Sequence, residues 1–206
     1  ERDNRLVGSE MCIRDSILIV GEFIFGLGDS LLIAAGVGNT PWTVLAEGIA
    51  DTAEVWTIGE ATFLVSIAVM FLWIPIKETP GIGTILNIII IALTIHVMVP
   101  ILPQSENFWV SILMASSGIV LVGIGSTMYL TANLGPGPRD GWMTGLQRAT
   151  GVPIGRVRIT IEASVLVIGI VLGGTFGIGT ILFALTIGPV VASCLSIASR
   201  IDSTTG

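Results

Sequence analysis

The amino-acid sequence predicts an all-α polytopic membrane protein with six transmembrane helices, arranged as a 3+3 inverted repeat with two short amphipathic or re-entrant helices. Of the 206 residues, 52% are hydrophobic and 12% are charged, about half of the roughly 25% charge found in soluble domains. Six apolar segments approach the ~20 residues that a spanning helix needs, and the two halves share motifs at a nearly constant offset. This composition excludes a disordered chain, a collagen, a coiled coil and an ordinary cytosolic enzyme.

Residues 1–16 differ in composition from the rest of the chain. This stretch, ERDNRLVGSEMCIRDS, contains seven charged side chains and does not begin with Met. Its second part resembles a translated sequencing-adaptor remnant, so we expect a non-native N-terminal segment; a genuine solvated cytoplasmic tail is the alternative. In either case the segment is excluded from the prediction of the fold.

Hydropathy predicts six membrane-spanning helices that are joined by short connections. The first contains Glu22 and Asp29 but no small-residue cleavage signal, so a cleaved signal peptide is not expected. The third ends where Pro100 and Pro103 interrupt an apolar, β-branched run; in lipid such a run forms a helix, because an open strand would leave backbone groups unpaired. The predicted helices cover residues 17–35, 58–76, 82–102, 108–132, 157–175 and 178–198.

The basic residues predict the orientation of the chain in the membrane. Outside residues 1–16, all six fall on one side if the N-terminus is cytoplasmic, because they lie in or beside the second and fourth connections and in the tail at 199–206. Since Lys and Arg are enriched in cytoplasmic loops, this pattern predicts six spans with both termini inside. The six residues are Lys77, Arg139, Arg148, Arg156, Arg158 and Arg200.

Motifs in the first half of the chain recur in the second half. Gly26-Leu27-Gly28 returns as Gly123-Ile124-Gly125 at an offset of 97, and the GIGT of residues 81–84 returns at residues 177–180. Because each copy contains three spans, the second copy enters the membrane from the opposite side, as in many secondary transporters. The predicted units are a first repeat over 17–102 and a second over 108–198.

Each repeat also contains a short amphipathic helix, predicted over residues 41–51 and 138–150. Thr40 and Pro41 supply an N-cap and a proline at the first helical position. The polar positions 43, 47 and 51 map at +97 onto 140, 144 and 148. Two placements stay open: a helix lying flat in the membrane interface, or a re-entrant half-helix whose positive N-terminal dipole points into a cavity.

Ionisable groups within spans cost roughly 2.5–3.5 kcal/mol each on insertion scales, which makes them candidates for function. We expect a site between the repeats, and the candidates for solute binding are Asp29, Thr43, Glu47, Asn87, Arg139, Asp140 and Glu162. Glu22, His96 and Arg158 are further ionisable groups in spans. Structural roles are the alternatives: an i,i+4 pair of Arg158 with Glu162, a hydrogen-bonded His96 rather than a proton relay, and a solvated Arg139-Asp140 rather than an anion site.

No pattern in the sequence is typical of a catalytic or metal site. With one histidine and no Cys/His cluster, neither a conventional zinc site nor a Ser-His-Asp arrangement is expected. The glycine-rich segments lack the Gly-Lys-Ser/Thr of a phosphate-binding loop, and Cys12 and Cys194 predict no disulfide. We therefore expect no enzyme, no cofactor, no metal and no nucleic-acid partner.

The repeated motifs resemble a known family. AGVGNTPWTVLAEGIA, WIPIKETPGIGTILN, LGPGPRDGWMTGLQRATG and GGTFGIGTILFALTIGPV resemble the YczE/YitT family of uncharacterised bacterial integral membrane proteins, over about residues 17–198. The resemblance implies a multi-pass protein of the bacterial inner membrane and no established substrate. Such proteins commonly read Pro-Trp-Asp in the first amphipathic helix, where this chain has Thr43, whereas Asp140 is kept in the second copy. A site built from paired acids would be only half present.

Two functions follow from this architecture. The leading hypothesis is a transporter-like permease in the lipid bilayer for a small polar or anionic solute, with its site between the repeats. The alternative is a membrane scaffold or regulatory protein that transports nothing. A hydrated cavity lined by both short helices would favour the permease, whereas two flat helices over a dry interface would exclude it.

Overall fold

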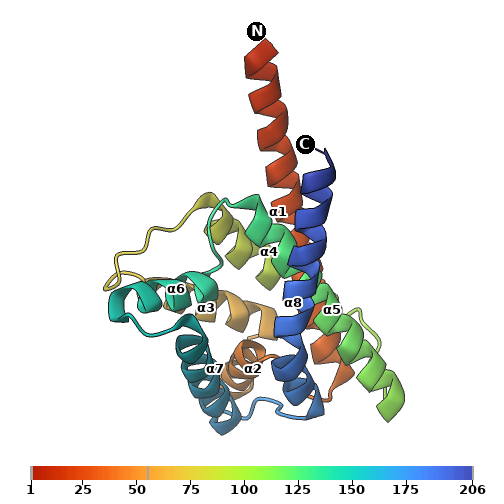
Figure 1. Cartoon of the computed structure of the whole chain (residues 1–206). Coiled ribbons are helices and arrows are strands. Elements are labelled where there is room, and N and C mark those ends of the chain that lie inside the picture. Colours follow the sequence, from red (N-terminus) through yellow and green to blue (C-terminus); the bar gives the residue numbers. More distant parts are fainter. Residues whose placement is uncertain (1, 55, 206) are drawn as a thin grey trace.

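The computed structural model describes residues 2–54 and 56–205. Within them the chain forms eight helices and no strand (Figure 1), which confirms the all-α prediction. The helices are α1 (Arg2–Ala35), α2 (Pro41–Ala53), α3 (Ile58–Phe71), α4 (Ile82–Met98), α5 (Phe108–Ala132), α6 (Pro138–Thr150), α7 (Ile154–Val171) and α8 (Ile178–Thr205).

Three described helices are long and apolar enough to cross a membrane by themselves. They are α1 over Cys12–Ala35, α5 over Phe108–Ala132 and α8 over Ile178–Arg200. The bent pair α2–α3 passes the same test when its two helices are taken together, whereas α4 is an apolar helix of only 17 residues. Length and composition thus give three spans, or four with the bent pair, rather than the six expected from hydropathy.

The helices expose large apolar side chains to their surroundings. Leu113 on α5, Val171 on α7 and Leu185 on α8 are 67%, 80% and 70% exposed. A monomeric soluble protein rarely shows apolar patches of this kind. In a bilayer the lipid tails cover such side chains, so no apolar surface is exposed to water. The exposed faces and the long apolar helices together identify a membrane protein.

Several predicted helix bounds differ from the structure. α1 begins at Arg2 rather than at residue 17, α2 ends at Ala53 rather than at 51, α7 covers Ile154–Val171 rather than 157–175, and α8 continues to Thr205 rather than to 198. The ends of α3 and α4 have identifiable causes. α3 ends at Phe71 rather than at residue 76, because the chain turns and buries Trp73, whose Nε1–H donates to the Pro138 carbonyl oxygen at 2.9 Å. α4 ends at Met98 rather than at residue 102. Val99 still has helical backbone angles (φ −56°, ψ −45°), but Pro100 has no N–H with which to continue the helical hydrogen bonds.

The long helices α1 and α5 form the centre of the molecule and pack closely through glycines. A Cβ at Gly125 would overlap the backbone at Gly21, and a Cβ at Gly28 would overlap the backbone at Gly118. As the residue number rises along α1 it falls along α5, so the two helices are antiparallel. α1, α5 and α8 share an apolar core. Its buried residues are Leu32 and Ala35 of α1, Ala115, Ile119 and Val122 of α5, and Phe183 and Ile187 of α8.

The helix bounds recur between the two halves of the chain. α1 and α5 end at Ala35 and Ala132, which are 97 residues apart, and α2 and α6 begin and end at the same offset. α4 and α8 begin at Ile82 and Ile178, which are 96 residues apart. The offset found in the sequence motifs is therefore also the offset of the secondary structure.

The duplicated GIGT motifs bind the opposite half of the chain. In the first lock (Val37 and Gly38 against residues 177–180), the Gly179 N–H donates to the Val37 carbonyl oxygen at 2.8 Å. In the second lock (Leu134 and Gly135 against residues 81–84), the Gly83 N–H donates to the Leu134 carbonyl oxygen at 2.9 Å. Each lock satisfies an otherwise unpaired donor at a helix N-terminus, so the repeated motif joins the two halves.

The short helices α2 and α6 fold back beside the long helices. On α2, the Thr43 hydroxyl donates to Asp29, six residues before the end of α1, and most of the helix is buried. On α6, Asp140 accepts a hydrogen bond from the Tyr129 hydroxyl, three residues before the end of α5. α2 and α6 thus begin alongside helices of the protein rather than beyond their ends.

Candidate functional site

A cavity of about 120 Å³ lies where the N-termini of α2 and α6 meet. Each of the eight described helices contributes to its wall. The volume is well above the roughly 10–15 Å³ that one water needs, so the cavity has room for several waters or a small solute. Its polar lining residues are Thr40, Ser66, Asn87, Ser126, Tyr129, Arg139, Asp140, Arg158 and Glu162.

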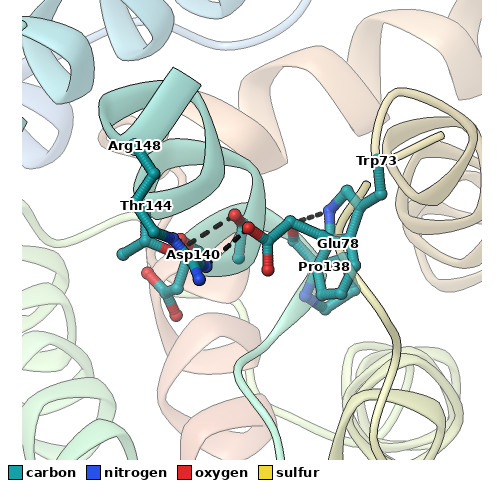
Figure 2. A network of polar contacts seen from close by, with 7 residues as sticks. Trp73, Glu78, Pro138, Asp140, Thr144 and Arg148 are labelled. Carbon is teal, nitrogen blue, oxygen red and sulfur yellow. Dashed lines mark hydrogen bonds and ion pairs between the residues drawn. The ribbon is translucent and has the colours of Figure 1, made fainter. Parts of the chain in front are cut away.

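Two buried aromatic side chains hold the N-terminus of α6 by hydrogen bonds. Gly137 and Pro138 occupy the N-cap and first helical positions, where proline loses no hydrogen bond. The buried Tyr129 hydroxyl donates to Asp140. The Trp73 indole donates to the Pro138 carbonyl oxygen at 2.9 Å (Figure 2). These contacts hold the first turn of α6 against the cavity.

An ion pair lies at the other end of α6. Arg148 Nη2 lies 2.5 Å from Glu78 Oε1. Glu78 follows α3 in the chain, and Figure 2 shows the pair. The arginine side chain is 65% exposed, so the pair contributes little to stability. Arg148 and Asp140 lie on the polar stripe that the sequence predicted, but Asp140 lines the cavity and Arg148 does not.

Arg139 lies at the centre of the site. Its guanidinium carbon is 5.2 Å from the centroid of the Trp42 ring, a cation–π geometry. Trp42 and Arg139 are equivalent positions of α2 and α6, 97 residues apart, so the two helix starts meet here. The guanidinium keeps its charge at neutral pH, because an arginine is effectively always protonated.

Arg158 and Glu162 contribute a second acid–base pair at the cavity wall. Arg158 Nε donates to Glu162 Oε1 at 2.8 Å, with spacing i,i+4 on α7. The two side chains are 46% and 24% exposed. Glu162 is therefore in the cavity wall as expected, and its charge is already paired with Arg158.

Asp29 and Thr43 lie behind the cavity wall. Both are fully buried, and the Thr43 hydroxyl donates to Asp29 Oδ2 at 2.9 Å while also bonding the Thr40 hydroxyl at 2.7 Å. Of these three residues only Thr40 lines the cavity. The structure thus joins two sequence candidates into one hydrogen-bonded group, which reaches the cavity through Thr40.

Glu47 and His96 lie away from the cavity. The Glu47 carboxylate accepts hydrogen bonds at 2.8 Å from the Thr175 N–H, the Thr175 hydroxyl and the Asn39 side-chain amide. His96 is exposed and its Nδ1 bonds the Thr57 hydroxyl at 2.9 Å. Glu47 therefore connects α2 to the segment before α8. Within residues 2–54 and 56–205, no three His, Cys, Asp or Glu side chains come together as metal ligands.

Replacing Glu47 with glutamine is expected to lower stability by about 2–3 kcal/mol. An amide accepts with one oxygen only, and hydrogen bonds to a charged group are worth roughly 1.5–3 kcal/mol. The midpoint of thermal unfolding in detergent, followed by tryptophan fluorescence, measures the change. The matched control is Glu54→Gln, an exposed acid at the C-terminus of α2. Equal midpoints for both variants would contradict a bridging role for Glu47.

Tyr129 was not among the sequence candidates, although it is the one tyrosine in the chain and lies within a predicted span. Its position in an apolar run is a signal that could have found it, because a buried phenol needs a hydrogen-bond partner and therefore indicates a polar group nearby. Ser66 and Ser126 gave no such signal, since hydroxyls in membrane helices commonly bond their own backbone.

The comparisons with known proteins agree with this picture of a membrane protein. A relative from Haemophilus influenzae, described as an uncharacterized protein, is 44% identical over 186 residues, which cover 90% of this chain and 85% of the relative. The uncharacterized membrane protein YczE of Bacillus subtilis is 32% identical over 184 residues, with 87% and 84% covered. The uncharacterized protein YyaS of the same organism is 26% identical over 175 residues, with 79% and 83% covered. No solved structure matches the chain.

The family comparison covers nearly the whole chain. The model of a family of unknown function, DUF6198, matches residues 12–196. This range includes α2 to α7 completely, every residue that lines the cavity and both locks. The chain is therefore a YczE-like membrane protein and belongs to the DUF6198 family.

Proposed function

We propose that the protein is a permease for a small polar solute with an anionic group, which binds in the central cavity. The observation that carries the proposal is the convergence of the α2 and α6 N-termini on one cavity beside Arg139. A helix N-terminus presents unpaired N–H groups and the positive end of the helix dipole. In transporters built from repeats, interrupted helices direct such N-termini at anionic solutes between the repeats.

We further propose that the two halves form a 3+3 inverted repeat over residues 17–102 and 108–198. The antiparallel packing of α1 and α5, which are equivalent helices, supports an inverted relation. The reciprocal pair of locks supports it as well. In this proposal α3 and α7 cross the membrane together with the re-entrant helices α2 and α6, which gives six crossings.

The free ends of α1 and α8 point to the same side of the molecule (Figure 1). This agrees with both termini lying in the cytoplasm of a bacterium and the chain crossing its inner membrane. The basic residues of the connections support this orientation, because cytoplasmic loops are rich in Lys and Arg. The lipid bilayer is then the principal partner of the exposed apolar faces.

The charges in the cavity favour an anionic group on the solute. Glu162 is paired with Arg158, and Asp140 is hydrogen-bonded to Tyr129. Among the described residues, Arg139 has a ring of Trp42 as its direct contact and no ion pair within 4 Å. A guanidinium presents its donors in a planar fork that matches a carboxylate or phosphate. The cavity is smaller than the roughly 300–1,000 Å³ typical of drug-sized ligands, so the solute is small.

A ligand-stabilisation screen of the purified protein tests this function. The panel contains small carboxylates, phosphates and sulfonates, together with neutral and cationic molecules of similar size. A ligand at 100 times its Kd raises the apparent stability by about 2.7 kcal/mol. We expect a subset of the anionic compounds to stabilise the protein and the size-matched neutral compounds to have no effect.

Transport of a stabilising compound into proteoliposomes then separates a permease from a scaffold. A permease accumulates or exchanges the compound without changing it chemically, so no enzyme activity and no cofactor are involved. Stabilisation without any flux would favour the scaffold or regulatory protein, and no stabilisation by any anion would contradict the proposed site.

A further inference from the structure

Glu22 is a completely buried carboxyl group in the middle of α1. Its side chain is 0% exposed, and within the described residues neither carboxyl oxygen has a hydrogen-bond partner. Asp29 on the same helix differs, because Thr43 donates to one of its oxygens and Arg139 acts on its charge. Glu47 differs as well, because it accepts three hydrogen bonds.

The helices that pack most closely against α1 are α4 and α5, and neither contains a Lys or Arg that could pair with Glu22. α4 contains one titratable side chain, His96, which is exposed and bonds Thr57. α5 also contains one titratable side chain, Tyr129, whose hydroxyl donates a hydrogen bond to Asp140. The side chain of Asn87 on α4 is close enough to influence the Glu22 carboxyl, but it makes no hydrogen bond to it.

A carboxylate anion is not stable in this environment. Transferring an isolated ionised group from water to an apolar medium has a large free-energy cost. In practice such a group becomes neutral instead. Charged groups within a membrane accordingly pair with an opposite charge or take part in ion and proton movement. Glu22 has no opposite charge beside it, so the neutral acid is the stable form.

Asn87 connects Glu22 to the cavity. It lines the cavity, and its side-chain amide lies against Gly137, the N-cap of α6. Arg139 and Asp140 follow within three residues. One side chain therefore separates the Glu22 carboxyl from the site proposed for the solute.

We propose that Glu22 is the proton-binding site of this permease, protonated in the conformation described here and exchanging its proton with cavity water past Asn87. Release leaves the Glu22 carboxylate and a hydronium ion in the cavity, so mass and charge balance without a further reactant. This inference rests on the proposed function. A proton on Glu22 removes a negative charge behind the anion site, so proton and anionic solute bind cooperatively, each raising the affinity of the other.

Infrared spectroscopy of the purified protein at neutral pH tests the protonation. We expect a C=O stretching band of a protonated carboxylic acid that is present in the unaltered protein, absent in Glu22→Gln, and retained in Glu106→Gln, an exposed control. Labelling with ¹³C-glutamate shifts the band in the unaltered chain, so the test stands even if Glu22→Gln does not fold. No such band, or a band that neither the label nor the variant changes, overturns the proposal.

Hydrogen–deuterium exchange of the same band tests the route to the cavity. Replacing Asn87 with leucine is expected to slow the exchange at least tenfold, because an apolar side chain closes the path. Thr94→Val, a polar-to-apolar change on the same helix, is the control. Equal exchange rates in Asn87→Leu and the unaltered protein would exclude this route. Both measurements use no solute, so their outcome is independent of the binding screen.

Discussion

Replacing Gly177 with alanine is expected to destabilise the protein by about 2–4 kcal/mol. A Cβ at this position would overlap the Val37 carbonyl oxygen, which belongs to the backbone and cannot move away alone. Overpacking of this kind costs typically 1–3 kcal/mol, and the displaced hydrogen bond from Gly179 to Val37 adds about 1 kcal/mol. The thermal unfolding midpoint in detergent measures the loss.

The chain provides a matched control and a symmetric repeat of the same experiment. Gly188 lies on α8, which begins directly after Gly177, and a Cβ there would meet no atom within 4 Å, so Gly188→Ala should leave the midpoint unchanged or raise it slightly. Gly81→Ala should lower it as Gly177→Ala does, because its Cβ would overlap the Leu134 carbonyl oxygen in the second lock. If Gly188→Ala were as damaging as Gly177→Ala, the locks would have no special role.

Replacing Arg139 with glutamine is expected to weaken the binding of anionic ligands and to reduce their stabilising effect strongly. Hydrogen bonds to a charged group contribute roughly 1.5–3 kcal/mol, which corresponds to a loss of affinity of about 10- to 150-fold. The fold should survive, because the guanidinium makes no ion pair within the described residues and the hydrogen bond from Thr43 to the buried Asp29 remains. Isothermal titration with the compounds that stabilise the unaltered protein measures the affinity.

Arg156→Gln is the matched control for this experiment. Arg156 is exposed near the start of α7 and does not line the cavity, so the substitution removes the same charge from the same connection. We expect it to change the affinity less than twofold. An equal loss in both variants would mean that the arginines act through the general electrostatic field, and it would argue against direct contact with Arg139.

The helix bounds near the repeats could be predicted from the sequence because local chemistry fixes them. Pro41 and Pro138 begin α2 and α6 as expected, and the offset of 97 holds for both ends of these helices. Proline at the first helical position acts through its own backbone geometry, so no knowledge of distant contacts is needed. The end of α3 at Phe71 depends on the distant contact of Trp73 with Pro138, and hydropathy does not contain that contact.

The candidate site could be predicted only in part. Four of the predicted residues line the cavity: Asn87, Arg139, Asp140 and Glu162. Glu47, on the polar stripe of α2, does not line it and accepts a hydrogen bond from Thr175 instead. A periodic pattern gives the face of a helix on which a residue lies, but not which neighbour that face meets. For the same reason the recurrence of GIGT indicated a duplication and did not reveal that each copy binds the other half of the chain.

The orientation of the two halves is the central claim, and cysteine accessibility tests it most directly. In a background with Cys12 and Cys194 replaced, single cysteines are introduced at Thr52, Gln104 and Arg148, which are all exposed. The inverted repeat predicts that a membrane-impermeant maleimide labels intact cells at positions 52 and 104, and labels position 148 only after permeabilisation. Labelling of all three positions from one side would contradict the inverted repeat.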